Sequence, residues 1–280
     1  MVHINIIVNI IMKSRKIQLI KKSYTSTPTI ETAISKIILD DASSKNSPEI
    51  LRFFEPRNLV AFSPRDSGKS GFKNAVNITY ENSFDPVLRL SGGKAALFHM
   101  GTIGFAWTIP DDNPKANVCE RFEEISLRIK ESLMSIGIDA HVGEIDGEYC
   151  PGRYSVNARR KIKLMGVGQR IAKYASHIGG IINVSNSNVT RKILTKIYKE
   201  LDYEWISSTA GSIEDEIGEI TNSEIISILI NKFSEYYSLE ETTLGNNIIE
   251  KAHNIEHNYN IENSIRDLES SQSILKDTLQ

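Results

Sequence analysis

The sequence predicts an α/β protein of the α+β type, with a mixed β-sheet flanked by helices. Short apolar runs bounded by Gly, Pro or Asn, typical of strands, mix with longer segments whose apolar residues recur every three or four positions, typical of helices. These segments do not follow the strict strand–helix alternation of a doubly wound fold. The 280 residues are 40% hydrophobic and 24% charged, which is enough for a large core.

The N-terminal part, residues 1–28, is predicted to be an extension. Its apolar run at residues 4–12 is too short to span a membrane, and basic residues follow the run where a signal peptide would place them before it. Two interpretations stay open: a strand added to the sheet, or an extension upstream of a start at Met12. No other segment could span a membrane, so we expect a cytoplasmic protein.

The main domain is predicted at residues 29–238. Strands are expected at residues 51–54, 59–63, 87–90, 95–98, 103–109 and 178–184, and helices from residue 28, at 116–136, at 190–201 and from 221. The helix at 116–136 has the clearest apolar stripe and ends before Gly137, which suits the position after a helix. Thr221 and Glu224 have the spacing of a capping box.

The last segment, residues 239–280, is predicted to be an acidic amphipathic helical tail. Acidic residues outnumber basic ones there, while apolar residues keep a helical spacing from Ile261 to Leu279. The tail would pack on the domain or on a partner, or stay disordered until bound.

Composition argues against several functional classes. The formal net charge of −2 gives no indication of a nucleic-acid partner. Two cysteines do not form a disulfide framework, so free thiols in a reducing compartment are expected. We interpret Cys119, beside the apolar stripe of its helix, as structural. No cluster of ligands has metal-site spacing, and the lone His99 is interpreted as structural.

Two glycine-containing motifs could hold a ligand. Ser67-Gly68-Lys69-Ser70 resembles the end of a P-loop, but Ser63 stands where that motif requires a glycine, so a polar loop is predicted. In residues 89–93, Arg-Leu-Ser-Gly-Gly, paired glycines would let the backbone approach a ligand that Arg89 could bind through its guanidinium. The alternative is a glycine turn with a solvated arginine.

Cys150 and Lys163 form the strongest candidate pair. Cys150 lies in a turn-rich loop at residues 147–157, and Lys163 and a predicted Gly-x-Gly turn follow. A nearby cation lowers a thiol pKa, and a lysine could stabilise an oxyanion. The alternative, a buried structural thiol and a surface lysine, is equally compatible with the spacing.

Together these motifs resemble a family. Arg89-x-Ser91-Gly92-Gly93, Gly101, Cys150-Pro151-Gly152 and Lys163-x-x-Gly166-x-x-Gln169-Arg170 are similar to the lipoate/octanoate protein ligases and transferases, which share a catalytic domain with biotin protein ligases. The resemblance covers about residues 29–237 and is strongest to the Cys-Pro-Gly branch of octanoyl/lipoyl amidotransferases. It implies a mixed sheet with an acyl tunnel and a Cys150 thioester. It also implies that Lys163 contacts the acyl carbonyl and that Arg89, Ser91, Gly92, Gly93, Gly166 and Gln169 bind substrate.

The predicted function is therefore protein lipoylation without a cofactor or metal, with a lipoyl domain of the E2 or glycine cleavage H type as acceptor. Lys94 stands where ATP-dependent ligases commonly have a third glycine, and His99 falls one position after their histidine. The alternatives are a ligase that uses ATP and Mg²⁺ and a catalytically silent lipoyl-domain binder. The basic run Arg159-Arg160-Lys161 could bind an adenylate phosphate or an acidic partner, or simply be solvated.

Overall fold

The computed structural model describes residues 15–44, 47–262 and 265. Its strands are β1 (Lys16–Ile20), β2 (Glu49–Phe54), β3 (Leu59–Phe62), β4 (Asp85–Leu88), β5 (Ala96–Phe98), β6 (Thr102–Pro110), β7 (Ala140–Val142), β8 (Val156–Ala158), β9 (Ile162–Ile171), β10 (Ala175–Asn183) and β11 (Ser238–Glu241). Its α-helices are α2 (Ile30–Ser43), α3 (Pro64–Ser67), α4 (Phe72–Glu81), α5 (Val118–Met134), α6 (Ser187–Glu200), α7 (Ile213–Ile217), α8 (Asn222–Ser234) and α9 (Asn246–Ile255).

Within the described residues, eight strands form the large sheet, in the order β11-β1-β2-β6-β10-β9-β8-β7. The β11–β1 and β1–β2 pairs are parallel, and the remaining pairs are antiparallel. The long strand β10 pairs with β9 on one side and with β6 on the other. In this register Gly179 of β10 lies opposite Gly168 of β9 and opposite Ala106 of β6. Small residues thus meet at the centre of the sheet, which leaves room above it.

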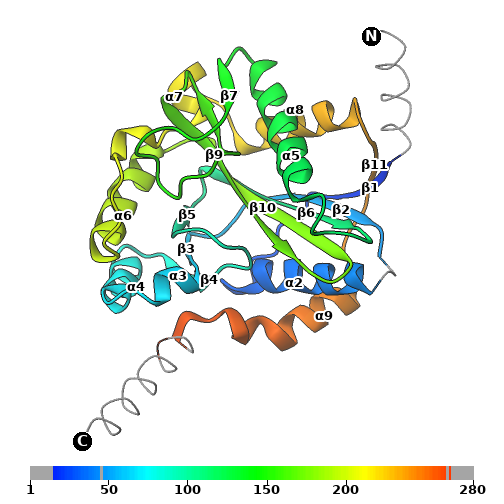
Figure 1. Ribbon diagram of the computed structural model, residues 1–280, viewed down its shortest axis with the longest axis horizontal. Helices are drawn as coiled ribbons and strands as arrows, with labels where there is room; N and C mark the ends of the chain where they lie inside the picture. The colour runs from blue at the N-terminus through cyan, green and yellow to red at the C-terminus, as the bar shows by residue number, and fades with distance from the viewer. Residues whose placement is uncertain (1–14, 45–46, 263–264, 266–280) are drawn as a thin grey trace, which may run out of the picture.

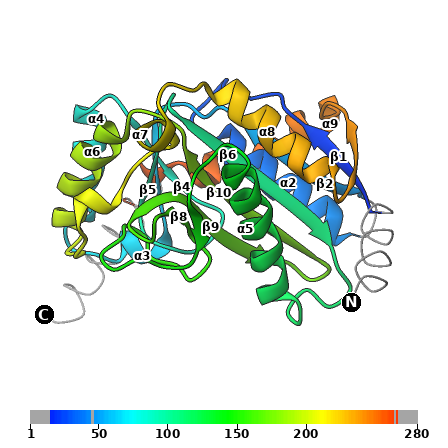
Figure 2. The same ribbon diagram turned by 90° about the horizontal axis from the view of Figure 1, so that it is seen from above.

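Helices cover both faces of this sheet. Helices α5 and α8 lie on one face, and α2 and α9 lie on the other (Figures 1 and 2). The layer formed by α5 and α8 encloses the largest core cluster, in which Ile125, Ile129 and Leu133 of α5 meet Leu229 and Phe233 of α8. The second layer packs the apolar side of α2 against Ile20, Ile50 and Ala252. The predicted fold class, a mixed sheet flanked by helices, is confirmed.

A second, three-stranded sheet has the order β4-β3-β5 and packs with α4 and α6 in a separate cluster. The parallel β3–β4 pair needs a crossover connection, which α3 and α4 provide. The β4–β5 connection contains Arg89, Ser91, Gly92 and Gly93, and its Arg89 and Ser91 side chains lie against Gly168 of β9 in the large sheet. The smaller sheet therefore holds one of the predicted motifs against the larger one.

Most predicted elements are present, with boundaries that differ by a few residues. The helix from Thr29, the long helix ending before Gly137 and the Thr221–Glu224 capping box are confirmed. The predicted Gly-x-Gly turn is wrong, because Gly166 and Gly168 lie inside β9. The interpretation of residues 67–70 as a loop is wrong in part, since Ser67 ends α3, whose cap is a Ser63–Asp66 capping box.

The first and last elements that the structure describes join the main domain. Strand β1, within the predicted N-terminal extension, pairs with both β2 and β11. The predicted tail begins with β11 and continues as α9, which packs on α2. The apolar run at residues 4–12 and the leucines after Ile265 lie outside the described residues. None of the helices in the described part of the chain combines the length and hydropathy that crossing a bilayer requires.

Candidate functional site

The loop between β7 and β8 places Cys150 at the meeting point of the two sheets. Cys150 has a φ of 41°, in the left-handed region that a side chain adopts at a cost of about 1–3 kcal/mol. Both of its backbone polar groups are held: its N–H donates to Tyr198 Oη at 2.9 Å, and its carbonyl accepts from Lys163 Nζ at 2.8 Å. The half-buried thiol is thus presented in a fixed, strained conformation.

The Arg89–Gly93 segment packs directly against this thiol. The backbone N–H of Lys94 donates to Cys150 Sγ at 3.2 Å, and the Arg89 guanidinium lies 3.9 Å from the same sulfur. Arg89 is itself held, because it donates to the Lys94 carbonyl at 2.9 Å and to Ser91 Oγ at 3.2 Å. One amide and one guanidinium therefore face the sulfur, so both neighbouring groups present N–H donors to it.

Lys163 lies beneath the Cys150 loop and is buried. Its ammonium donates to Glu148 Oε1 at 2.9 Å, to the Tyr149 carbonyl at 2.9 Å and to the Cys150 carbonyl at 2.8 Å. Glu148 Oε1 also accepts from Gly152 N at 3.0 Å and Ser155 Oγ at 2.7 Å. The three N–H bonds of the Lys163 ammonium therefore have three acceptors, and all three belong to the loop that carries the thiol.

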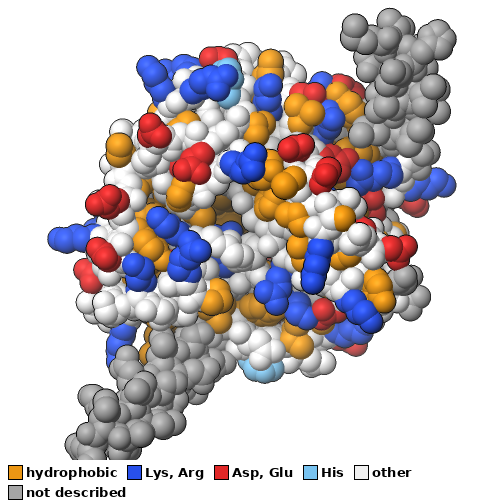
Figure 3. Space-filling model, viewed as in Figure 1, with side chains coloured by type: hydrophobic (Ala, Val, Ile, Leu, Met, Phe, Trp, Pro, Cys, Tyr) orange, Lys and Arg blue, Asp and Glu red, His pale blue; other side chains and the backbone are white. Residues whose placement is uncertain are grey.

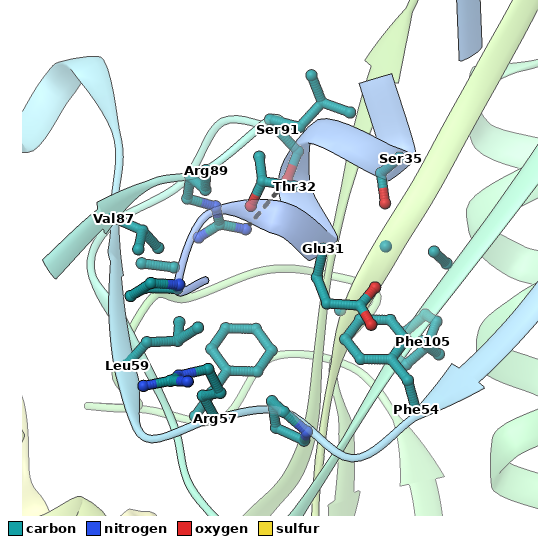
Figure 4. Close-up of a pocket in the computed structure, with 18 of the residues that line it drawn as sticks. Glu31, Thr32, Ser35, Phe54, Arg57, Leu59, Val87, Arg89, Ser91 and Phe105 are labelled. Carbon is teal, nitrogen blue, oxygen red and sulfur yellow. Dashed lines mark hydrogen bonds between the residues drawn. The ribbon is translucent and has the colours of Figure 1, made fainter. Parts of the chain in front are cut away.

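An apolar cavity of about 100 Å³ opens beside this site. Figure 3 shows the molecule hollowed on this face, with hydrophobic side chains inside the hollow and lysine and arginine side chains beside it. In Figure 4, Arg89 and Ser91 lie at one side of the cavity, Leu59 and Val87 form a second wall, and Phe105 lies across from them. Arg89 is therefore shared between the cavity and the thiol.

Glycines allow the close packing between cavity and thiol. Gly93 has a φ of 127°, and a Cβ there would meet Arg89 Nη1 and Cys150 Sγ, each at 2.9 Å. A Cβ on Gly168, in β9, would lie 2.7 Å from Ser91 Oγ and 3.2 Å from Arg89 Nη2. Neither position has space for a larger residue without moving the groups that face the sulfur.

The predicted site residues do not all meet. Cys150, Lys163, Arg89, Ser91 and Gly93 are brought together as described above. Gly166 contacts the Lys163 side chain, since a Cβ there would lie 3.3 Å from Lys163 Cε. Gly92 has no neighbouring atom within 4 Å of such a Cβ.

Gln169 lies away from this cluster. Its side chain accepts from Arg121 Nη2 at 2.9 Å and donates to the Val118 carbonyl at 3.3 Å, so it joins β9 to α5. Alternation along a strand explains the difference, because Gly168 and Gln169 face opposite sides of the sheet. Gly168, which the sequence interpretation left out, is the residue of that pair that contacts Arg89 and Ser91.

Other residues that the sequence singled out lie elsewhere or act structurally. The basic run Arg159-Arg160-Lys161 forms the exposed β8–β9 turn, where Arg159 pairs with Glu216 at 2.7 Å. His99 is buried, and burial lowers its pKa to about 4; its Nδ1 accepts from Gly101 N at 3.0 Å, consistent with a structural role. Cys119 is exposed. The described residues place no group of His, Cys, Asp and Glu together that could hold a metal ion.

Besides Gly168, two residues of the site were missed by the sequence interpretation. Glu148 immediately precedes Tyr149-Cys150, but its role depends on Lys163, which arrives from another strand. Tyr198, on α6, is fully buried and bonds to the Cys150 backbone. No local pattern marked either residue, because both act through contacts between segments distant in sequence.

Comparison with known families and proteins supports the assignment of this fold. Residues 27–234 match the family model described as the lipoyl protein ligase A/B catalytic domain. An octanoyl-[GcvH]:protein N-octanoyltransferase of Geobacillus kaustophilus is 24% identical over 169 residues, which cover 60% of this chain and 59% of that protein. The protein of the same name from an Exiguobacterium species is 21% identical over 79% of this chain and 83% of its own length. A lipoyl-[GcvH]:protein N-lipoyltransferase of Listeria monocytogenes is 23% identical over 49% of this chain and 51% of its own length.

Solved structures share the architecture. A Thermoplasma acidophilum structure with bound lipoic acid superposes with a TM-score of 0.69 at 17% identity, over 86% of this chain and 94% of the other. A lipoate-protein ligase A bound with ATP gives a TM-score of 0.68 over the same shares at 17% identity. At this identity the likeness establishes the fold alone, and it confirms the lipoate ligase-like fold that the sequence predicts.

Proposed function

Because this chain belongs to the lipoyl protein ligase A/B catalytic domain family, we propose that it transfers an octanoyl or lipoyl group to a lysine of a lipoyl domain through a thioester on Cys150. The observation that carries the proposal is the shared position of Arg89. Its guanidinium lies 3.9 Å from Cys150 Sγ and also lines the apolar cavity. An acyl chain in the cavity would thus bring its carbonyl end towards the thiol.

The reaction has two balanced steps. The Cys150 sulfur attacks the carbonyl of the donor amide, the C–N bond breaks, and the thiol proton ends on the departing lysine amine. The amine of the acceptor lysine then attacks the thioester, a new C–N bond forms, the C–S bond breaks, and a proton returns to the sulfur. Since one amide is broken and an equivalent amide is formed, the proposed transfer needs no nucleotide.

The groups around the sulfur match these steps. The Lys94 amide at 3.2 Å and the Arg89 guanidinium at 3.9 Å from the sulfur would stabilise the negative charge that develops on the attacked carbonyl. That Lys163 donates to the acyl carbonyl stays a prediction. Its ammonium already donates to three protein acceptors and would have to give up one of them to bind the substrate. On the contacts present, Lys163 would serve by holding the strained loop.

The relatives support the choice of donor and acceptor. Proteins named as octanoyl- or lipoyl-[GcvH] transferases take the acyl group from GcvH, and a structural neighbour was solved as part of a lipoylation system with an E2 lipoyl domain. We accordingly propose that the acceptor is a lipoyl domain of the E2 or glycine cleavage H type. The proposed acyl groups, octanoyl and lipoyl, share an aliphatic chain that an apolar cavity would bind.

The test measures acyl transfer by intact mass. The protein is incubated with an octanoylated H protein and an unmodified E2 lipoyl domain, and separately with free lipoate, each with and without ATP and Mg²⁺. Mass gain on the E2 domain from the octanoylated donor without ATP supports the proposal. Gain seen with free lipoate and ATP but not with the acylated donor overturns it in favour of a ligase, and no gain under any condition overturns it in favour of a binder.

The thioester itself is tested with a matched pair of cysteine variants. Cys150→Ser should abolish the acyl adduct and reduce transfer by at least a hundredfold, whereas Cys119→Ser, which removes an exposed thiol, should retain both. Undiminished transfer by the Cys150→Ser protein would rule out the thioester route.

A further inference from the structure

A buried tyrosine hydroxyl joins the two backbone segments that meet at the thiol. Tyr198 Oη accepts from Cys150 N at 2.9 Å and donates to the Ala95 carbonyl at 2.9 Å. The first partner belongs to the loop after β7 and the second to the segment before β5. One oxygen atom therefore fixes the separation between the two segments.

The same two segments hold the contact between thiol and amide. Lys94 immediately precedes Ala95, and its N–H donates to Cys150 Sγ at 3.2 Å. The Tyr198 hydroxyl and the Lys94 amide thus bridge the same pair of segments, one at the backbone of Cys150 and the other at its side chain. Arg89 also spans the two segments, because it donates to the Lys94 carbonyl at 2.9 Å and lies 3.9 Å from the sulfur. Removal of the hydroxyl bridge would leave the backbone of Cys150 without its contact to the Lys94–Ala95 segment.

Tyr198 is built into its place. The residue is 1% exposed, and its ring packs edge-on against Tyr203, with ring centroids 5.4 Å apart, and at a tilt against Trp205, at 5.6 Å. Burial raises the pKa of Tyr198 well above its ordinary value, so the phenol stays neutral and both donates and accepts. A neutral, enclosed hydroxyl is suited to holding backbone groups rather than to exchanging protons with substrate.

We propose that Tyr198 is a positioning residue for acyl transfer, whose hydroxyl keeps the Lys94 amide aligned with the Cys150 sulfur. The expected effect of Tyr198 on acyl transfer rests on the proposed function. Its expected effect on the reactivity of the thiol does not. Hydrogen bonding to the charged form favours the thiolate, so a misaligned amide would make the thiol a weaker acid and a slower nucleophile.

Several charged and titratable groups surround the sulfur. They are Arg89 and Lys94 before β5, Glu148 and Tyr149 on the Cys150 loop, Lys163 on β9, Tyr198 on α6, and Asp66 and Tyr203 beside Tyr198. The variant and its control must therefore leave these charges in place. Tyr→Phe substitutions do so at neutral pH, because they remove an uncharged hydroxyl.

The experiment compares Tyr198→Phe with Tyr203→Phe, both in a Cys119→Ser background so that alkylation reports Cys150. The Tyr203 hydroxyl donates to Asp66 Oδ1 at 2.9 Å and has no hydrogen bond to the Cys150 loop, so Tyr203→Phe removes a phenol from the same aromatic cluster without touching the bridge. The rate of iodoacetamide alkylation is measured from pH 5 to 10. Tyr198→Phe should react about tenfold more slowly at neutral pH with its midpoint moved to higher pH, and Tyr203→Phe should follow the parent.

Acyl transfer provides the second measurement. Tyr198→Phe should lower kcat about tenfold and leave KM for the acceptor within about twofold, since no binding contact is changed. An alkylation profile of Tyr198→Phe that coincides with that of Tyr203→Phe would overturn the inference. Absence of an acyl adduct on the parent protein would instead overturn the proposed function, while the alkylation profiles would still decide the role of Tyr198.

If Tyr198→Phe does not fold, hydrogen exchange of the unmodified protein tests the bridge instead. The Cys150 amide, which donates to the enclosed hydroxyl, should exchange slowly despite lying in a loop. Fast exchange at that amide would contradict a persistent bridge.

Discussion

The ammonium of Lys163 and the carboxylate of Glu148 form an ion pair, 2.9 Å apart, whose side chains are 1% and 0% exposed. The pair lies under the Cys150 loop and is completed by the backbone carbonyls and the hydroxyl around it. Its geometry connects the predicted nucleophile to the core of the domain. It also means that substitutions at Lys163 report on folding as well as on chemistry.

Removal of one partner from this pair should be strongly destabilising. Lys163→Met would leave the Glu148 carboxylate buried without its countercharge, which typically costs about 3–5 kcal/mol. Urea unfolding of Lys163→Met should show this loss, whereas Lys161→Met, in the exposed β8–β9 turn, should stay within about 0.5 kcal/mol of the parent. Equal stability of the two variants would show that the pair does not support the loop.

A side chain at Gly93 should disturb the thiol. The new Cβ of Gly93→Ala would meet Cys150 Sγ and Arg89 Nη1 at 2.9 Å, at a φ of 127° that alanine rarely adopts. Alkylation of Cys150 and acyl transfer should both fall by about tenfold or more. Gly68→Ala, whose nearest neighbours would be at 3.7 Å, is the matched control, and a similar effect of both substitutions would contradict the prediction.

The cavity wall should set the length of the acyl chain. Val87 is buried and lines the cavity, so Val87→Phe would fill space that the distal carbons need. Octanoyl transfer should fall about tenfold relative to butanoyl transfer, which a competition between the two donors measures. Val189→Phe adds the same volume on α6, outside the cavity lining, and should leave the chain-length preference unchanged.

Two buried histidines should make the fold sensitive to acid. Burial lowers the pKa of His99 and of His177 to about 4, below the ordinary value near 6.5. Because the folded-state pKa values are depressed, their neutral forms contribute full stability above about pH 6.5, and this contribution is lost as the pH falls towards 4.

The loss should approach about 3 kcal/mol for each ring. The free energy of unfolding, measured by urea titration across this range, should decline as the pH falls. Substitution of His177 by a residue that does not titrate should make the decline shallower. A slope that does not change would show that His177 is not the titrating group.

Local patterns predicted the parts of the molecule that local physics determines. The Thr221–Glu224 capping box and the α5 stripe depend on residues three or four positions apart, so the sequence contains all of their partners. Cys150 was found because its turn-rich loop stood out and because the ordered motifs resemble a known family. In contrast, the group that donates to the sulfur is the backbone N–H of Lys94, which every residue except proline has, so the residue type does not predict it.

Errors arose where strand register decides the outcome. Gln169 was expected in the site and Gly168 was not, although the two are neighbours, because a shift of one residue along β9 reverses the face of the sheet. The interpretation of Gly166 and Gly168 as a turn failed for a related reason: their small size serves close packing against Lys163 and Ser91 within a strand. Register is set by distant partners, which a single sequence does not display.

The segment after β11 closes the domain from outside the region that matches the family. Glu256 accepts hydrogen bonds from Thr27 and Thr29, just before the first turn of α2, and Lys251 pairs with Asp41 near its end. Helix α2 supplies part of the cavity lining, yet the family match ends at residue 234. A protein shortened to the matched region would keep every residue proposed for chemistry but lose the contacts that hold α2, one wall of the cavity, from the C-terminal side. The region that matches the family and the region that packs around the cavity therefore have different boundaries.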